Sequence, residues 1–378
     1  MVSEGTGRRS TGKCEGGQVM KKAVALIAAV AMAGTSVAGY GATTVKADDK
    51  KEIYVLIKAR GDLSYWDSMA NGGDRAAEDF ADEANVHVIE TTGDTEANLS
   101  AMYEAADNGA DLIISAGDFL DNMMTVADEY PDCGFLLVNE KMEDVDNIYS
   151  IDFRTSEAGF LGGIAAADVA KQNGSDTIGF IGGMDEVIVI QEFFMGYIQG
   201  AKYYNPDIKI VYNYVGDWGD PDKGRTQALA QFNDSGVEVI FACAGGSGNG
   251  VHQAASEVGK YVIGVDSDQS ATYTEQPDIQ KTFITSCMKK MDNGIYNTIQ
   301  DFLENGTLPY GQYDVFGLKD DAVGIVENDL FNEYVSEDGK KAIEEATAKI
   351  DDGSIEVKGA INREQSEIQA EISELLGE

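Results

Sequence analysis

Short apolar runs and amphipathic stretches alternate along the chain from residue 52 onward. The apolar runs predict strands at 53–59, 86–91, 111–117, 134–139, 148–153, 177–183, 208–216, 238–246, 261–268 and 281–287. The stretches between them predict helices at 66–84, 95–108, 119–129, 155–172, 190–204, 220–235, 249–258 and 288–304. Alternation of this kind, with near-continuous Val and Ile runs, indicates an α/β fold of parallel sheets covered by helices on both faces.

The two halves of the chain contain similar segments. "NGADLIISAG" (108–117) and "SGVEVIFACAG" (235–245) share a helix end, a glycine, an acidic residue and a buried strand that ends in small residues. Ten strands could form one large sheet, but two doubly wound parallel-sheet lobes explain the similarity better. Ligands of such sheets bind beyond the carboxyl ends of the strands, so we expect a ligand cleft between the lobes.

The two ends of the chain differ from this pattern. A basic start at Met20 and the apolar run 23–34 are typical of a signal peptide, which we place at 20–47. Residues 1–19 are interpreted as lying upstream of the natural start. The apolar run is short for a membrane span, although an uncleaved anchor remains an alternative. At the other end, residues 358–378 predict an amphipathic helical tail.

The charge of the chain excludes one class of partner. The sequence has 28 Lys and Arg against 66 Asp and Glu, which gives a net charge of −38. Such a field repels phosphates, so we expect no nucleic-acid partner.

The residues of the usual metal and catalytic sites do not occur in the required spacing. The cysteines are Cys14, Cys133, Cys243 and Cys287, without a C-x-x-C pair, and the histidines are His87 and His252. We therefore predict buried free thiols, no metal or other cofactor, and no catalytic residues.

The turn after the first strand is a candidate ligand contact. It contains Asp62, Ser64, Tyr65 and Trp66, where an acid and two aromatic rings suit a polar ligand that carries a ring. The alternative is structural: Ser64 would cap the following helix, and Trp66 would belong to the core.

Three later strand ends add candidates. Asp266 ends the strand 261–268, and a carboxylate there suits two neighbouring hydroxyls of a sugar. Lys289 follows the next strand and could neutralise Asp266, although either charge could instead cap a helix or lie in solvent. Gly246, in the turn "GGSGNG" (245–250), allows close approach of a ligand or is part of a plain tight turn.

Two adjacent phenylalanines begin the helix at 190–204. Phe193 shares one face with Gly196, Tyr197 and Gly200, whereas Phe194 shares another with Ile190, Ile198 and Ala201. Either face could pack on the sheet, and periodicity does not choose between them.

These features together resemble the basic membrane protein (Bmp) family of ABC-transporter substrate-binding proteins, which includes the bacterial purine-nucleoside-binding lipoproteins. The resemblance covers about residues 52–357. It rests on "GGMDEVIVIQEFFMGYIQGAKYYNPDIKI" (182–210), "GDWGDPDKGR" (216–225), "VIFACAGGSGNGVHQAA" (239–255), "GKYVIGVDSDQ" (259–269), "ITSCMKKMD" (284–292) and "FGLKDDAVGI" (316–325).

The resemblance implies a type I periplasmic-binding fold with three crossovers, expected near 152, 268 and 313. Lobe 1 would then contain residues 48–152 and 269–313, and lobe 2 residues 153–268 and 314–357.

It also implies a site in which a nucleoside lies in the cleft. Phe193 would be the ring that stacks on the base. Asp266 would accept the ribose hydroxyls, with Lys289 as its cationic partner. Gly246 would lie in the turn near the sugar, and Trp218 matches an aromatic strand-end position.

Three positions depart from the family. Trp66 and Asn139 replace an Asn and an Asp at the base end of the pocket, which leaves the base open. Tyr40 replaces the cysteine of the lipid-attachment site, so no diacylglyceryl anchor is expected.

The sequence therefore predicts an exported, extracellular or cell-surface protein. It would bind a nucleoside, with a purine nucleoside as the first candidate, as a monomer, and deliver it to an ABC-transporter permease. The alternatives are the same fold with a sugar or signalling molecule as ligand, and a nucleoside-processing enzyme.

Overall fold

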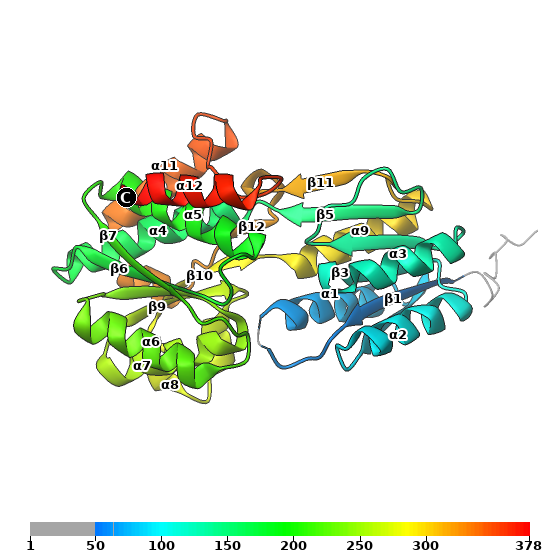
Figure 1. Ribbon diagram of the computed structural model, residues 1–378, viewed down its shortest axis with the longest axis horizontal. Helices are drawn as coiled ribbons and strands as arrows, with labels where there is room; N and C mark the ends of the chain where they lie inside the picture. Colours follow the sequence, from blue (N-terminus) through cyan, green and yellow to red (C-terminus); the bar gives the residue numbers. More distant parts are fainter. Residues whose placement is uncertain (1–49, 63) are drawn as a thin grey trace, which may run out of the picture. The chain divides into compact units, whose positions relative to one another are not determined.

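The structure, a computed structural model, describes residues 50–62 and 64–378. The predicted leader (1–19) and signal peptide (20–47), with Cys14 and Tyr40, lie outside the described residues. Within the described part, the strands form two sheets, as predicted, and each sheet has six strands (Figure 1).

The first sheet has the order β11-β5-β4-β3-β1-β2, and the strands paired in it are parallel. Its strands are β1 (Lys51–Ile57), β2 (Ala84–Glu90), β3 (Leu112–Ala116), β4 (Gly134–Val138), β5 (Ile148–Phe153) and β11 (Tyr313–Phe316).

The second sheet has the order β12-β10-β9-β8-β6-β7, and β12 alone is antiparallel to its neighbour. Its strands are β6 (Thr177–Gly182), β7 (Lys209–Tyr214), β8 (Val239–Cys243), β9 (Tyr261–Asp266), β10 (Phe283–Lys289) and β12 (Val323–Ile325).

Both sheets repeat one winding. In each, the second strand along the chain lies at one edge, and the first, third, fourth and fifth strands follow in order. The two similar sequence segments contain β3 and β8, which hold the same third position in their sheets. The internal similarity therefore reflects two copies of one doubly wound topology.

Helices cover both sheets. The helices that pack with the first sheet are α1 (Tyr65–Asp79), α2 (Thr95–Asp107), α3 (Leu120–Glu129) and α9 (Met291–Asn305). Those associated with the second are α4 (Thr155–Gln172), α5 (Ile188–Tyr204), α6 (Pro221–Asp234), α7 (Gly248–Val258), α8 (Pro277–Gln280), α10 (Asp329–Tyr334), α11 (Glu337–Asp351) and α12 (Gln365–Leu376).

The helices α4 and α5 approach each other at backbone distance. A Cβ atom on Gly196 would lie 1.9 Å from the carbonyl oxygen of Ser156, and one on Gly200 would lie 1.8 Å from that of Phe160. The face of α5 that carries Phe193 therefore packs on α4, and only glycine fits at these two crossing points. This contact fixes the direction of α5, whose first turn reaches the site described below.

One predicted lobe boundary is wrong. Residues 269–313 were assigned to the first lobe, but β10 belongs to the second sheet, where Cys287 pairs with Val265 and Met288 with Asp266. The chain returns to the first sheet only after Lys289, at the start of α9. The other two crossings lie at Arg154, between β5 and α4, and between β11 and β12. The crossover expected near 268 is thus replaced by one near 290.

Two strands and three α-helices had no counterpart in the prediction, namely β11, β12, α8, α10 and α11. The two strands have four and three residues, which is too short for a periodic signal. The predicted C-terminal helix is present as α12, which lies beside α5 and buries Ile368 and Ile372 (Figure 1). The three cysteines in the described residues are buried and free, as predicted.

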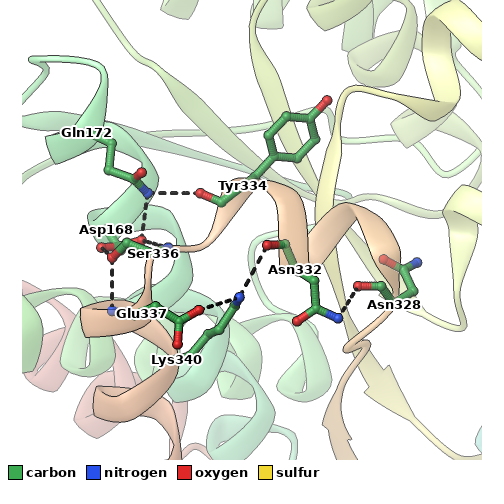
Figure 2. A network of polar contacts seen from close by, with 9 residues as sticks. Asp168, Gln172, Asn328, Asn332, Tyr334, Ser336, Glu337 and Lys340 are labelled. Atoms are coloured by element: carbon green, nitrogen blue, oxygen red, sulfur yellow. Dashed lines mark hydrogen bonds and ion pairs between the residues drawn. The ribbon is translucent and has the colours of Figure 1, made fainter.

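A buried carboxylate joins α11 to α4. Asp168 of α4 is 1% exposed and accepts hydrogen bonds from Gln172 Nε2 and from both the amide and the hydroxyl of Ser336 (Figure 2). The Ser336 hydroxyl also accepts the amide of Gly339 and so caps α11. Gln172 donates in addition to the carbonyl of Tyr334, at the end of α10. These bonds hold the C-terminal part of the chain on the second sheet.

Candidate functional site

A cavity of about 540 Å³ lies at the carboxyl ends of the strands of both sheets. Its volume is within the range of small-molecule sites, roughly 300–1,000 Å³. All ten residues proposed from the sequence line it, namely Asp62, Ser64, Tyr65, Trp66, Asn139, Phe193, Trp218, Gly246, Asp266 and Lys289. The structure thus brings the candidates together, while their contact with a ligand stays a prediction.

The polar centre of the cavity is the carboxylate of Asp266. The Ser64 hydroxyl donates to Asp266 Oδ2 at 2.5 Å, and Lys289 Nζ lies 3.4 Å from Asp266 Oδ1. The Lys289 side chain is only 1% exposed, and its ammonium lies 4.5 Å from the centre of the Tyr65 ring. A buried cation is thereby matched by one carboxylate and one aromatic face.

The ladder between β9 and β10 explains this meeting. Met288 pairs with Asp266, so Asp266 and Lys289 end adjacent strands. Asp266 has a left-handed backbone with a φ of 64°, which Asp adopts more readily than most residues.

The turn after β1 both lines the cavity and caps the helix α1, the two roles considered for it from the sequence. Ser64 occupies the cap position of α1 but makes no side-chain cap bond, and its hydroxyl reaches Asp266 instead. The capping is done by Asp62, whose carboxylate accepts from the amides of Ser64, Trp66 and Asp67 at 2.9–3.1 Å. Burial raises the pKa of Asp62, and these three amide hydrogen bonds act against that rise.

Aromatic rings line the same cavity as the Asp266 carboxylate. Tyr65 and Trp66 meet edge to face with centroids 4.8 Å apart. Trp218 is 43% exposed, and its ring lies against Gly183, where a Cβ atom would be 2.3 Å from the ring. The cavity therefore offers flat apolar surfaces next to a carboxylate.

The two phenylalanines have different surroundings. Phe193 lines the cavity and packs edge to face on Phe241, with centroids 5.7 Å apart. Phe194 does not line this cavity and stacks on Phe180 at 4.4 Å. Of the two rings, only Phe193 lines the cavity, and its contact with a ligand stays a prediction, whereas Phe194 packs in the core.

Asn139 presents an unsatisfied oxygen. Like Asp266 it ends a strand in the left-handed region, with a φ of 63°. Its Oδ1 atom is buried and has no hydrogen-bond partner within the described residues. Because an unpaired buried acceptor is costly, a donor on a bound ligand would stabilise this arrangement.

Three charged residues that line the cavity, Lys58, Asp118 and Glu140, were not predicted from the sequence. Lys58 Nζ lies 2.8 Å from Asp118 Oδ2 and 5.6 Å from the centre of the Trp66 ring. Asp118 lies two residues beyond the end of β3, so the strand-end argument used for Asp266 would have found it. Lys58 follows β1 directly, and a lysine at that position does not differ in the sequence from an ordinary solvent-exposed lysine.

The described residues show no group of His, Cys, Asp or Glu that could hold a metal ion. His252 lies in the core, where burial lowers its pKa to about 3 and Tyr273 is its hydrogen-bond partner at 3.0 Å. None of the helices from residue 50 onward is long and apolar enough to cross a membrane.

The comparisons with known proteins agree with this geometry. Residues 50–359 match the Bmp family model, described as ABC transporter substrate-binding protein PnrA-like. Basic membrane protein D of Borreliella burgdorferi is 35% identical over 267 residues, which are 69% of this chain and 75% of that protein. The ABC transporter nucleoside-binding protein BmpA of Lactococcus lactis is 31% identical over 364 residues, which are 89% and 99% of the two chains.

A solved structure supports the fold. An ABC transporter solute-binding protein from Aeropyrum pernix has a TM-score of 0.74 and 27% identity, with 86% of this chain and 98% of that chain covered. A periplasmic solute-binding protein from Actinobacillus succinogenes, solved with D-allose, has a TM-score of 0.56 at 16% identity, covers 75% of this chain and all of its own, and shows the fold alone. The expected type I periplasmic-binding fold is thus confirmed, and the chain belongs to the Bmp family of PnrA-like ABC transporter substrate-binding proteins.

Proposed function

We propose that this substrate-binding protein captures a nucleoside outside the cytoplasm, with a purine nucleoside as the first candidate, and delivers it to the permease of an ABC importer. The observation that carries the proposal is the buried cluster of Asp266, Ser64 and Lys289 beside aromatic rings in one cavity. A carboxylate accepts two hydrogen bonds, as a vicinal diol requires, and the rings offer stacking surfaces for a base.

The two tryptophans give a direct assay. They are the only ones in the sequence, and both Trp66 and Trp218 line the cavity. Titration with inosine, guanosine, adenosine, cytidine and uridine should therefore change the intrinsic fluorescence in a saturable way. A response to D-ribose or D-allose but to no nucleoside would refute the proposal in favour of a sugar-binding protein.

A matched pair of variants can separate the role of the Asp266 carboxylate from the general effect of losing one negative charge. Asp266→Asn should weaken nucleoside binding by about tenfold to a hundredfold, the value of a hydrogen bond to a charged group. Asp268→Asn is the matched control, because Asp268 caps a turn two residues away and does not line the cavity. Equal affinities of the Asp266→Asn protein and the unaltered protein would refute the proposed contact between Asp266 and a ligand diol.

Three further parts of the proposal have their own tests. Chromatography of a nucleoside after long incubation with the protein should show it unchanged, and the free base would instead indicate an enzyme. Size-exclusion chromatography should show a monomer. Labelling of producing cells with a fatty acid should leave the protein unlabelled, because Tyr40 stands in place of the cysteine that would carry the lipid.

A further inference from the structure

The C-terminal helix α12 is connected by hydrogen bonds to a segment that lines the cavity. This wall of the cavity is the segment 184–190, which leads from β6 into α5 and contributes Val187, Val189 and Ile190 to the cavity lining. The family match ends at residue 359, so α12 lies beyond it. We propose that the side chain of Gln365 in α12 positions this wall and thereby sets ligand affinity.

The connection is a pair of amide side chains. Gln191 Nε2 donates to Gln365 Oε1 at 2.7 Å, and Gln365 Nε2 donates back to Gln191 Oε1 at 3.2 Å. Gln191 is fully buried on the first turn of α5. Two amides that satisfy each other hold a fixed relative orientation, since a shift of either one breaks both bonds.

The same two side chains hold the wall by its backbone. Gln191 Nε2 donates to the carbonyl of Asp185 at 2.8 Å, and Gln365 Nε2 donates to that of Glu186 at 3.0 Å. Asp185 and Glu186 are exposed to solvent, so the core does not fix them. Consecutive carbonyls of the wall are thus bound by amides from two different helices.

The helix that carries Gln365 is itself firmly held. Ile368 and Ile372 are buried, and Lys202 of α5 donates to the carbonyl of Leu375. Just before α12, Glu192 of α5 is 2% exposed and accepts the amides of Ala360 and Ile361. Gln365 therefore acts from a rigid support, and it lies outside the residues that line the cavity.

An ordered wall raises affinity because less conformational entropy is lost when a ligand binds. This part of the inference rests on the proposed function. Gln365→Ala should weaken nucleoside binding by roughly fivefold, the effect of about one hydrogen bond. The double variant Gln191→Ala/Gln365→Ala should bind about as weakly as Gln191→Ala alone, because the residues act as one unit.

Two controls separate positioning from loss of the helix. Gln369→Ala makes the same chemical change one turn along, at an exposed position. Glu371→Gln removes the pairing of Glu371 with Lys358 at 2.5 Å and with Arg363 at 3.4 Å, while the buried Ile368 and Ile372 still hold α12 in place. Neither residue contacts the wall through the hydrogen bonds described, so both variants should keep the original affinity.

Hydrogen exchange of the unliganded proteins gives a readout that needs no ligand. Gln365→Ala should speed exchange in peptides that cover 184–190, and Gln369→Ala and Glu371→Gln should not. Unchanged exchange there, or equal weakening of binding by Glu371→Gln, would overturn the inference. If the unaltered protein binds no nucleoside, the proposed function fails, while the exchange data still decide whether Gln365 orders the wall.

Discussion

A buried acid at the first crossing between the sheets should make stability depend on pH. Asp152, near the end of β5, is 8% exposed, and burial raises its pKa from the ordinary value of 3.8 to about 6. Hydrogen bonds from the Phe153 amide at 2.7 Å and the Tyr313 hydroxyl at 3.1 Å act in the opposite direction, as does the charge of Lys289. Desolvation outweighs all three.

The sign follows from proton binding. Between pH 3.8 and 6 the folded protein keeps the proton of Asp152 and the unfolded chain has lost it. The folded state therefore binds more protons, and stability falls as the pH rises through this window. A shift of about two pKa units corresponds to about 3 kcal/mol, present below the window and lost above it.

The test compares Asp152→Asn with the unaltered protein in urea unfolding from pH 4 to 8. The many other carboxylates affect both proteins alike, so the difference in unfolding free energy isolates Asp152. We expect the variant to gain up to about 3 kcal/mol relative to the unaltered protein between pH 4 and pH 7. Parallel pH profiles of the two proteins would refute the reasoning.

Tyr313→Phe provides a second check at the same carboxylate, because it should shift the pKa of Asp152 without removing its titration. It removes a hydrogen bond that lowers the pKa of Asp152, so the steep part of the profile should move to higher pH. A shift to lower pH would contradict the assignment of Asp152 as the titrating group.

Three further changes test the cavity. Lys289→Met should destabilise the protein by about 3 kcal/mol in thermal unfolding, because it leaves the Asp266 carboxylate buried without its cation, and an unchanged melting temperature would contradict a buried ion pair. Gly183→Ala should displace the Trp218 ring and change its fluorescence emission, and an unaltered spectrum would contradict their close packing. Asn139→Asp should favour guanosine over the other nucleosides, because a carboxylate offers two acceptors to the two adjacent donors on the pairing edge of guanine. An unchanged order of nucleoside affinities in the titration would place Asn139 away from the base.

Two doubly wound sheets could be predicted because most of their strands are near-continuous apolar runs that alternate with helices. Strands such as β3 (LIISA) and β4 (GFLLV) are buried along their whole length, so apolar residues fill nearly every position. The boundary at β10 was not predictable in this way. An apolar strand has the same pattern in either sheet, and only its ladder with β9 shows that it belongs to the second.

The site was predictable as far as the strand-end rule reaches. Asp266 and Asn139 directly follow apolar runs or end them, and in parallel sheets these ends gather at one edge. The role of Asp62 was different from expectation in one respect, since its oxygens are engaged by the amides at the start of α1. A short acid before a helix fits both a ligand contact and a cap, and only the geometry separates them.

The contacts of Gln365 could not be predicted from local sequence patterns. Gln365 and Gln191 are separated by 174 residues, and a glutamine gives no periodic or motif signal at either place. Their meeting depends on α5 lying against both α4 and α12, which in turn depends on the glycines that let α4 and α5 touch. The strand-end residues form the floor of the cavity by topology alone, whereas the position of its wall depends on helix packing far from the strands. Affinity should therefore respond to the substitution of Gln365, although no residue of α12 lines the cavity.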